Sequence, residues 1–245
     1  ISPLVLGLGR VIIGVASGMI STSAMLGISH VLPAEHKTKA AQIASLVSVA
    51  GFGSGPFISG WIAQLLPHPL ITPYITVLIP SFIVLIGLHT VTQKTQKKRG
   101  RPSFKPKLET PTEPAFKSLF LIISLTSFVA FGMFSLYGSL APSFLKEMIP
   151  WHGPAVSGTA IASVLFISGL TQFMLRSLSL HMTLYLGMLL LLLACLALGF
   201  TMSTRSSLLF VIADILTGIA HGASLLAAFG LVAKITTPEN RGPIF

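Results

Sequence analysis

Residues 182–203 read MTLYLGMLLLLLACLALGFTMS, an apolar run without a single charged side chain. A helix of about 20 such residues crosses the ~30 Å hydrocarbon core of a bilayer at ~1.5 Å per residue. Because there is no water at that depth, the backbone must satisfy its own hydrogen bonds within the segment. The run therefore predicts a transmembrane helix and excludes an open strand.

The rest of the 245-residue chain has the same character. Hydrophobic side chains make up 52% of it and charged ones 9%, with a mean hydropathy of +0.85, whereas a soluble domain carries about 25% charged residues. Further apolar runs of spanning length occur at 3–31, 40–66, 71–91, 118–141, 154–175 and 207–235. The expected fold class is an all-α, polytopic membrane bundle of seven helices. Pro142 and Pro150 are expected to break or end the fourth of these helices.

The basic residues predict the orientation and the domains. Thirteen of them fall on one side of the predicted spans, eight of these between Lys94 and Lys117, and only Lys146 and Arg205 fall on the other. Since Lys and Arg favour the cytoplasmic side, the chain is expected to begin outside and end inside. Residues 93–117 then form a basic cytoplasmic linker between a bundle of three helices (1–92) and one of four (118–245).

The net charge of +10 does not indicate a nucleic-acid partner. Half of the basic residues lie in the linker and most of the others at the ends of apolar runs, so they form no basic face. A lipid- or nucleic-acid-binding role of the linker remains an alternative to ordinary positive-inside bias.

Two distant spans share a pattern that predicts an internal repeat. In each, an ionisable residue is followed by glycines four and eight positions later, at a constant offset of 204 residues: Arg10, Gly14 and Gly18 in the first span, and Asp214, Gly218 and Gly222 in the last. Both spans run on to a Pro-containing acidic segment, at 32–37 and 237–241. Repeated halves joined by a loop are typical of transporters, in which one bundle rocks against the other.

The second span carries the most informative motif. Its sequence GFGSGPFISG (residues 51–60) resembles the Gly-x-x-x-Gly-Pro-x-x-Gly-Gly motif in the fifth helix of proton-coupled antiporters of the major facilitator superfamily, with Ser59 in place of one glycine. Small residues one turn apart let a neighbouring helix approach closely, and a proline bends its own helix. The motif predicts that Gly51, Gly55, Pro56 and Gly60 shape a gate; a plain packing face is the alternative.

The first span fits the same resemblance. Arg10 to Gly14 resemble the Arg-x-x-Gln-Gly motif of the superfamily's fourth helix, with Ile13 at the usual Gln position, and in the family that arginine is linked to proton coupling. A guanidinium inside a span costs at least ~2.5 kcal/mol, so it normally faces a partner or a water-filled cavity. Snorkelling of Arg10 to the interface is the alternative. The resemblance implies that the chain is a fragment covering about helices four to ten of a twelve-helix architecture.

Asp214 is the only acidic residue well inside an apolar run, and His221 lies two turns later on the same helical face. We predict that Asp214 exchanges protons or binds a cationic substrate; a structural hydrogen bond is the alternative. The equivalent depths of Arg10 and Asp214 suggest an ion pair between them. His221 on its own fits a satisfied buried histidine equally well.

Two further patterns concern the fourth and fifth spans. An aromatic stripe at every third position suggests a pocket lining or, more simply, packing against lipid or a neighbour: Phe128, Phe131, Phe134 and Tyr137. The fifth span has a polar edge suited to helix contact or a water path: Ser157, Gly158, Ser168, Gly169 and Gln172.

We find no metal site, catalytic nucleophile, cofactor motif or disulfide framework in the sequence, which has one cysteine, Cys195. The function expected is transport of small molecules by alternating access, most simply proton-coupled export of lipophilic or cationic compounds. Uptake symport of a sugar or organic acid, and a seven-helix receptor, are the alternatives. We expect a monomer in the cell membrane, with protons as the coupling ion and no nucleic-acid partner.

Overall fold

The computed structural model describes residues 2–31, 37–92, 114–148, 150 and 153–235. Within these ranges the chain folds into seven α-helices and no strand: α1 (Pro3–Val31), α2 (Lys37–Leu65), α3 (Thr72–Thr92), α4 (Pro114–Met148), α5 (Pro154–Leu175), α6 (Leu180–Thr204) and α7 (Ser207–Ile235). Each helix is long and apolar enough to cross a membrane. The predicted all-α fold is confirmed. Residues 93–113 of the predicted linker lie outside the described residues, and residues 114–117 form the first turn of α4.

The fourth helix differs most from the sequence prediction. We expected Pro142 and Pro150 to break or end it, but α4 runs through Pro142 to Met148. Pro142 withdraws one amide donor, and a membrane bundle tolerates this where neighbouring groups satisfy the freed backbone. One turn later Leu145 is buried in the same apolar cluster as Phe210 of α7. The expectation that Pro142 ends the helix was wrong, because Leu145 beyond it packs in the core, whereas the end of α4 at Met148 agrees with the expectation for Pro150.

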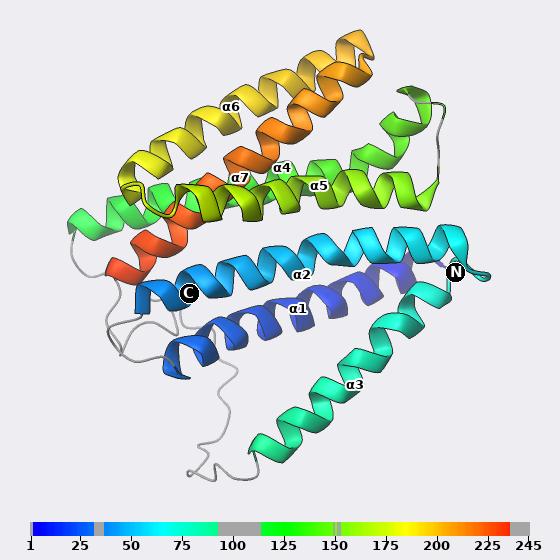
Figure 1. The fold of residues 1–245 in the computed structure, drawn as a ribbon, viewed down its shortest axis with the longest axis horizontal. Coiled ribbons are helices and arrows are strands. Elements are labelled where there is room, and N and C mark those ends of the chain that lie inside the picture. The colour runs from blue at the N-terminus through cyan, green and yellow to red at the C-terminus, as the bar shows by residue number, and fades with distance from the viewer. Residues whose placement is uncertain (1, 32–36, 93–113, 149, 151–152, 236–245) are drawn as a thin grey trace.

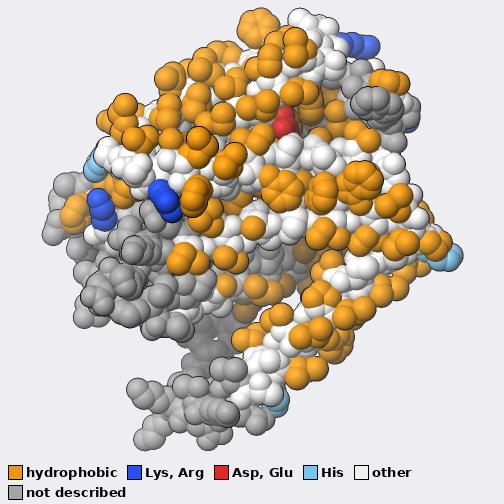
Figure 2. All heavy atoms as spheres, in the orientation of Figure 1, with side chains coloured by type: hydrophobic (Ala, Val, Ile, Leu, Met, Phe, Trp, Pro, Cys, Tyr) orange, Lys and Arg blue, Asp and Glu red, His pale blue; other side chains and the backbone are white. Residues whose placement is uncertain are grey.

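The helices form two groups that meet along α2 and α5 (Figure 1). These two helices run side by side through the middle, with α1 and α3 on one side and α4, α6 and α7 on the other. Side chains of α3 are exposed along nearly its whole length. Figure 2 shows that apolar side chains dominate this face of the molecule, as expected of a surface that meets lipid.

Short turns set the antiparallel order of α5, α6 and α7. Ser179 caps α6 by accepting a hydrogen bond from the amide of Met182 at 3.3 Å. Arg205 ends α6 in the left-handed conformation (φ 51°, ψ 32°), and its amide donates to the carbonyl of Thr201 at 2.9 Å. The hydroxyl of Ser206 then accepts from the amide of Leu209 at the start of α7. Two residues therefore reverse the chain between two membrane-long helices.

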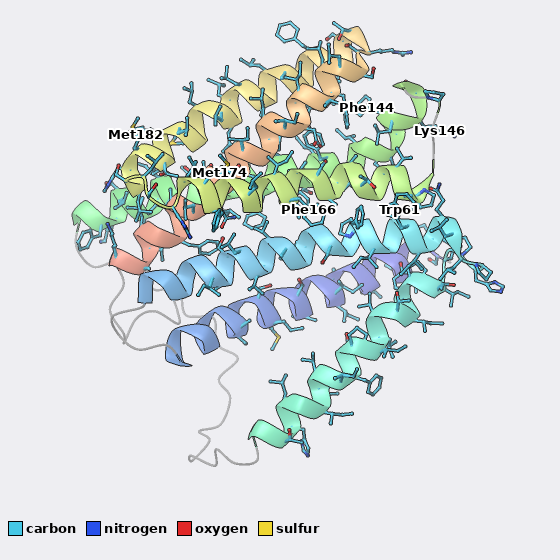
Figure 3. The ribbon with its side chains drawn as sticks, viewed as in Figure 1. Trp61, Phe144, Lys146, Phe166, Met174 and Met182 are labelled. Carbon is cyan, nitrogen blue, oxygen red and sulfur yellow. The ribbon has the colours of Figure 1, made fainter. Side chains whose placement is uncertain are left out.

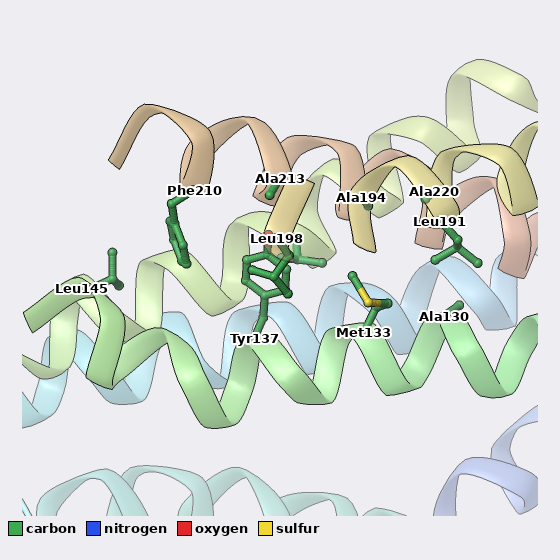
Figure 4. Close-up of a cluster of buried hydrophobic side chains, with 11 residues drawn as sticks. Ala130, Met133, Tyr137, Leu145, Leu191, Ala194, Leu198, Phe210, Ala213 and Ala220 are labelled. Carbon is green, nitrogen blue, oxygen red and sulfur yellow. The ribbon is translucent and has the colours of Figure 1, made fainter. Parts of the chain in front are cut away.

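The core lies among α4, α5, α6 and α7, and α7 is the most buried of the seven helices within the described ranges. Figure 4 shows Tyr137 and Met133 of α4 pointing towards Leu198 and Ala213 of the α6–α7 pair. Small residues on α6 and α7 bring these helices together. Most of the core thus belongs to one of the two groups, and a small cluster of Val49, Leu165 and Leu225 extends it across the boundary to α2.

Candidate functional site

The boundary between the groups is an antiparallel seam of α2 and α5. Near one end, the hydroxyl of Ser45 donates to Oε1 of Gln172 at 2.8 Å. At the other end, Oε1 of Gln64 accepts from the amide of Ala155 at 3.0 Å. Figure 3 shows Trp61 of α2 and Phe166 of α5 in the boundary between these two helices. The two groups are therefore held together by hydrogen bonds near both ends of the seam.

The closest approach in the seam is made by Gly60 and Gly158. A Cβ added to either glycine would lie 3.2 Å from the Cα of the other, and one on Gly158 would strike the carbonyl oxygen of Pro56. Gly53 also faces α5, where an added Cβ would lie 3.1 Å from that of Leu165. Only small residues allow backbones to approach so closely.

The predicted gate motif is therefore only partly in contact with α5. Gly60 and Pro56 take part in the close crossing, whereas an added Cβ on Gly51 or Gly55 would meet no described atom within 4 Å. The sequence had singled out Gly158 only as part of a polar edge. Its pairing with Gly60 was not visible, because a contact between residues 98 positions apart leaves no local pattern.

A buried chain of polar groups crosses the seam and ends on His221. Nε2 of Gln172 lies 3.5 Å from the hydroxyl oxygen of Ser168, which in turn lies 2.9 Å from Nδ1 of His221. If Ser168 accepts from Gln172, its own hydrogen is left for Nδ1, and the ring proton then sits on Nε2. Nε2 has no hydrogen-bond partner among the described residues, although His221 is fully buried.

A cavity of about 300 Å³ lies between the two groups beside His221, and we call it the central cavity. Its walls come from α1, α2, α4, α5 and α7 and include four serines and four phenylalanines: Ser17, Gly18, Ser21, Ser45, Ser48, Val49, Phe52, Phe131, Phe134, Leu165, His221, Leu225 and Phe229. Its volume suits a small organic molecule. Both helix groups therefore contribute to one pocket.

The aromatic stripe of α4 divides between three environments. Phe131 and Phe134 line the central cavity, with ring centroids 5.3 and 6.1 Å from that of His221. Phe128 is 76% exposed on the apolar surface, and Tyr137 is 1% exposed in the core. The pocket interpretation therefore applies to the middle of the stripe and the packing interpretation to its ends, because the stripe drifts around the helix.

Asp214 lies in a different place, facing α5. Its Oδ2 accepts a hydrogen bond from the hydroxyl of Ser163 at 2.7 Å, while Oδ1 is buried with no partner among the described residues. The residue borders a second cavity of about 530 Å³, which we call the Asp214 cavity, at the end of the bundle where α2 ends and α5 begins. Nothing is described of the Arg10 side chain, so the suggested pair of Arg10 with Asp214 stays a prediction.

The two sets of repeat glycines have different surroundings. Added Cβ atoms on Gly218 and Gly222 would strike the backbone of α5 at Val164 and Ser168, whereas those on Gly14 and Gly18 would meet no described atom within 4 Å. Gly18 borders the central cavity instead. The two acidic segments that follow the repeat, at 32–37 and 237–241, lie almost entirely outside the described residues, so the repeat stays a prediction.

Within the described ranges no three His, Cys, Asp or Glu side chains gather as metal ligands do. The polar groups that do gather, serines, a glutamine and a histidine, are suited to hydrogen-bonding a neutral or weakly polar molecule. The sequence did not single out Ser45, Ser163 or Gln64, because serine and glutamine are ordinary residues of membrane helices until their partners are known.

Comparison with known proteins gives one match. The sequence profile of the Major Facilitator Superfamily matches residues 2–245. No curated protein and no solved structure matches the chain. The profile covers all seven helices and both cavities, and its family consists of membrane transporters rather than enzymes. The chain therefore belongs to the major facilitator superfamily, whose multi-pass membrane proteins transport small molecules.

Proposed function

We propose that this protein exports lipophilic or cationic small molecules in exchange for protons, by alternating access. The observation that carries the proposal is the central cavity, which has walls from both helix groups and a buried histidine with one ring nitrogen unpartnered. A pocket shared by two rocking bundles is where substrate binds in this mechanism. Its phenylalanines suit a lipophilic body, and its serines and His221 suit one or two polar groups.

The moving parts are residues 1–92 and 118–245, joined by a cytoplasmic linker at 93–117. Among the described residues, Lys117, Arg176 and Lys234 lie at the helix ends next to this linker, and Lys146 and Arg205 lie at the opposite ends. This distribution supports an orientation in the cell membrane with the linker inside. The opposite end, with Gly60 and Gly158, is then the outer end of the seam.

The Gly60–Gly158 crossing acts as the pivot of the gate. The close backbone contact lets the two helices roll on each other without opening a leak, and Pro56 removes an amide donor from the same turn. A Cβ added to Gly51 or Gly55 would meet no described atom within 4 Å, which leaves room for a neighbour to approach in another state of the transport cycle.

Arg10, Asp214 and His221 form the proposed set of coupling residues. Asp214 and His221 lie on one face of α7, each with one unpartnered polar atom among the described residues. An Arg10→Ala and Asp214→Ala double-mutant cycle, measured as transport rate, tests whether the guanidinium and the carboxylate act as a pair. Strictly independent effects would show that they do not.

The proposal is tested in inverted membrane vesicles that contain the protein and have an acidified lumen. Addition of a lipophilic cation should release protons from the lumen, because an exporter exchanges the two. The control is the same preparation without the protein. If substrate addition releases no protons, while an imposed gradient drives sugar or organic-acid uptake in right-side-out vesicles, the protein is a symporter and the proposal is wrong.

A further inference from the structure

The Asp214 cavity is a pocket of drug-sized volume, about 530 Å³, separate in its described lining from the central cavity. Four helices line it: the end of α2, the end of α4, α5 as far as Ile167, and the start of α7. Trp61, Leu145, Phe210 and Ile215 give it aromatic and aliphatic walls. Pockets of this size and character bury most of the surface of a small organic ligand.

One buried carboxyl group interrupts these apolar walls. Asp214 is 7% exposed, and the hydroxyl of Ser163 satisfies only its Oδ2. Oδ1 has no hydrogen-bond partner among the described residues. A buried carboxylate oxygen without a partner is costly, so the position favours a ligand that supplies a positive charge or a donor.

The described surroundings of Asp214 do not supply that charge. The described residues that line the cavity include no lysine, arginine or histidine, and none of them belongs to α1. The one ion pair among the described residues joins Arg205 to Glu147, and both of these side chains are largely exposed. Gln64, the other long polar side chain in the lining, already accepts from the amide of Ala155.

We propose that the Asp214 cavity is a second binding site, beside the central cavity, for the lipophilic monovalent organic cation that the protein exports, with the positive charge against Oδ1 of Asp214 and the apolar body against Trp61 and Phe210. Aromatic walls attract a cation that has lost water more strongly than a neutral body of equal size. An organic anion would be repelled, and a sugar would leave most of its hydroxyl groups unpaired. This inference rests on the proposed export function and adds a second binding site for its cationic substrates.

The test is equilibrium binding of radiolabelled tetraphenylphosphonium to the purified protein, with neutral triphenylphosphine oxide as a ligand of similar shape. Asp214→Asn keeps the size of the side chain and an acceptor for Ser163. It should weaken tetraphenylphosphonium binding roughly 10- to 100-fold, because it removes a charged contact. Binding of triphenylphosphine oxide should not weaken, because that ligand carries no charge for Asp214 to meet and its phosphoryl oxygen can accept from the new amide.

Glu147→Gln is the matched control, since it removes the same charge from an exposed carboxylate outside the cavity lining. It should leave the affinity for both ligands unchanged. Trp61→Leu replaces an aromatic side chain of the cavity lining by a smaller apolar one and leaves Asp214 unchanged. It should weaken the binding of both ligands. This second variant keeps the pocket testable should Asp214→Asn fail to fold.

Two results would overturn the proposal: unchanged tetraphenylphosphonium affinity in Asp214→Asn, or equal loss of both ligands in that variant while Trp61→Leu has no effect. Measuring proton release by the same variants tests the export function separately from this binding site. If Trp61→Leu binds tetraphenylphosphonium more weakly but still exchanges protons for a neutral lipophile, the inference and the export function both stand. If the wild-type protein binds tetraphenylphosphonium but never releases protons, the export function fails and the binding site stands.

Discussion

Gly60 of α2 and Gly158 of α5 face each other across the seam, so close that a Cβ added to either would lie 3.2 Å from the Cα of the other. This contact joins the two helix groups near one end of the seam. It depends on two hydrogen atoms in place of side chains, and for that reason it can be tested by the smallest possible substitution.

Gly158→Ala should lower the free energy of unfolding by about 1–3 kcal/mol, the usual cost of overpacking, because the new methyl group would strike the backbone of α2 at Pro56. The measurement is reversible unfolding in detergent. Gly199→Ala is the control, since an added Cβ there meets no described atom within 4 Å. A Gly158→Ala protein as stable as this control would contradict the close crossing.

Ser45 and Gln172 should be energetically coupled across the seam. Ser45→Ala and Gln172→Met each remove one side of a buried hydrogen bond of 2.8 Å, and a double-mutant cycle should give a coupling free energy of about 0.6–1.7 kcal/mol. The control cycle combines Ser45→Ala with Ser81→Ala, whose exposed hydroxyl bonds within its own helix. Additive effects in the Ser45–Gln172 cycle would mean that this bond does not hold the groups together.

His221→Leu should preserve the fold and impair transport. Leucine fills much of the space between Phe131 and Phe134 but offers no ring nitrogen to Ser168 or to a substrate. Loss of one substrate hydrogen bond of about 1–1.5 kcal/mol should raise KM roughly tenfold. The measurement is uptake into inverted vesicles, and His181→Gln at the exposed start of α6 is the control. An unchanged KM would remove His221 from the binding site.

Replacing Arg205 by glycine should leave the protein stable, whereas replacing it by valine should destabilise it. Its backbone has a φ of 51°, where a glycine is free of strain and a β-branched residue is not. Its ion pair with Glu147 is 3.9 Å long and largely exposed, so losing it should cost no more than about 1 kcal/mol. In thermal unfolding, Arg205→Gly should match the wild type within that range and Arg205→Val should be clearly less stable. Equal stability of the two variants would argue against a left-handed turn.

Hydropathy predicted the helices well because the requirement for backbone hydrogen bonding in lipid is local. The bounds of α1, α5 and α7 were predicted to the residue. The error at α4 has the same origin. Hydropathy reports where the hydrocarbon layer ends, whereas Leu145, beyond Pro142, continues the helix by packing on α7.

The candidate site was predictable only where a residue was unusual in itself. Asp214 stood out as an acid within an apolar run, and the structure gives it a partner, Ser163, that no sequence pattern marks. Gly60 stood out through its motif, but its counterpart Gly158 did not. Partners, unlike spans, depend on how helices distant in sequence cross, and this information is not local.

The central claim is that the two helix groups move against each other about the α2–α5 seam. Its most direct test is the distance between paired spin labels at each end of the bundle, on a Cys195→Ala background: Leu70→Cys with Lys146→Cys at one end, and Thr90→Cys with Met174→Cys at the other. On adding substrate or changing pH, the account predicts that one distance lengthens while the other shortens. Distances that both stay fixed, or that lengthen together, would contradict it.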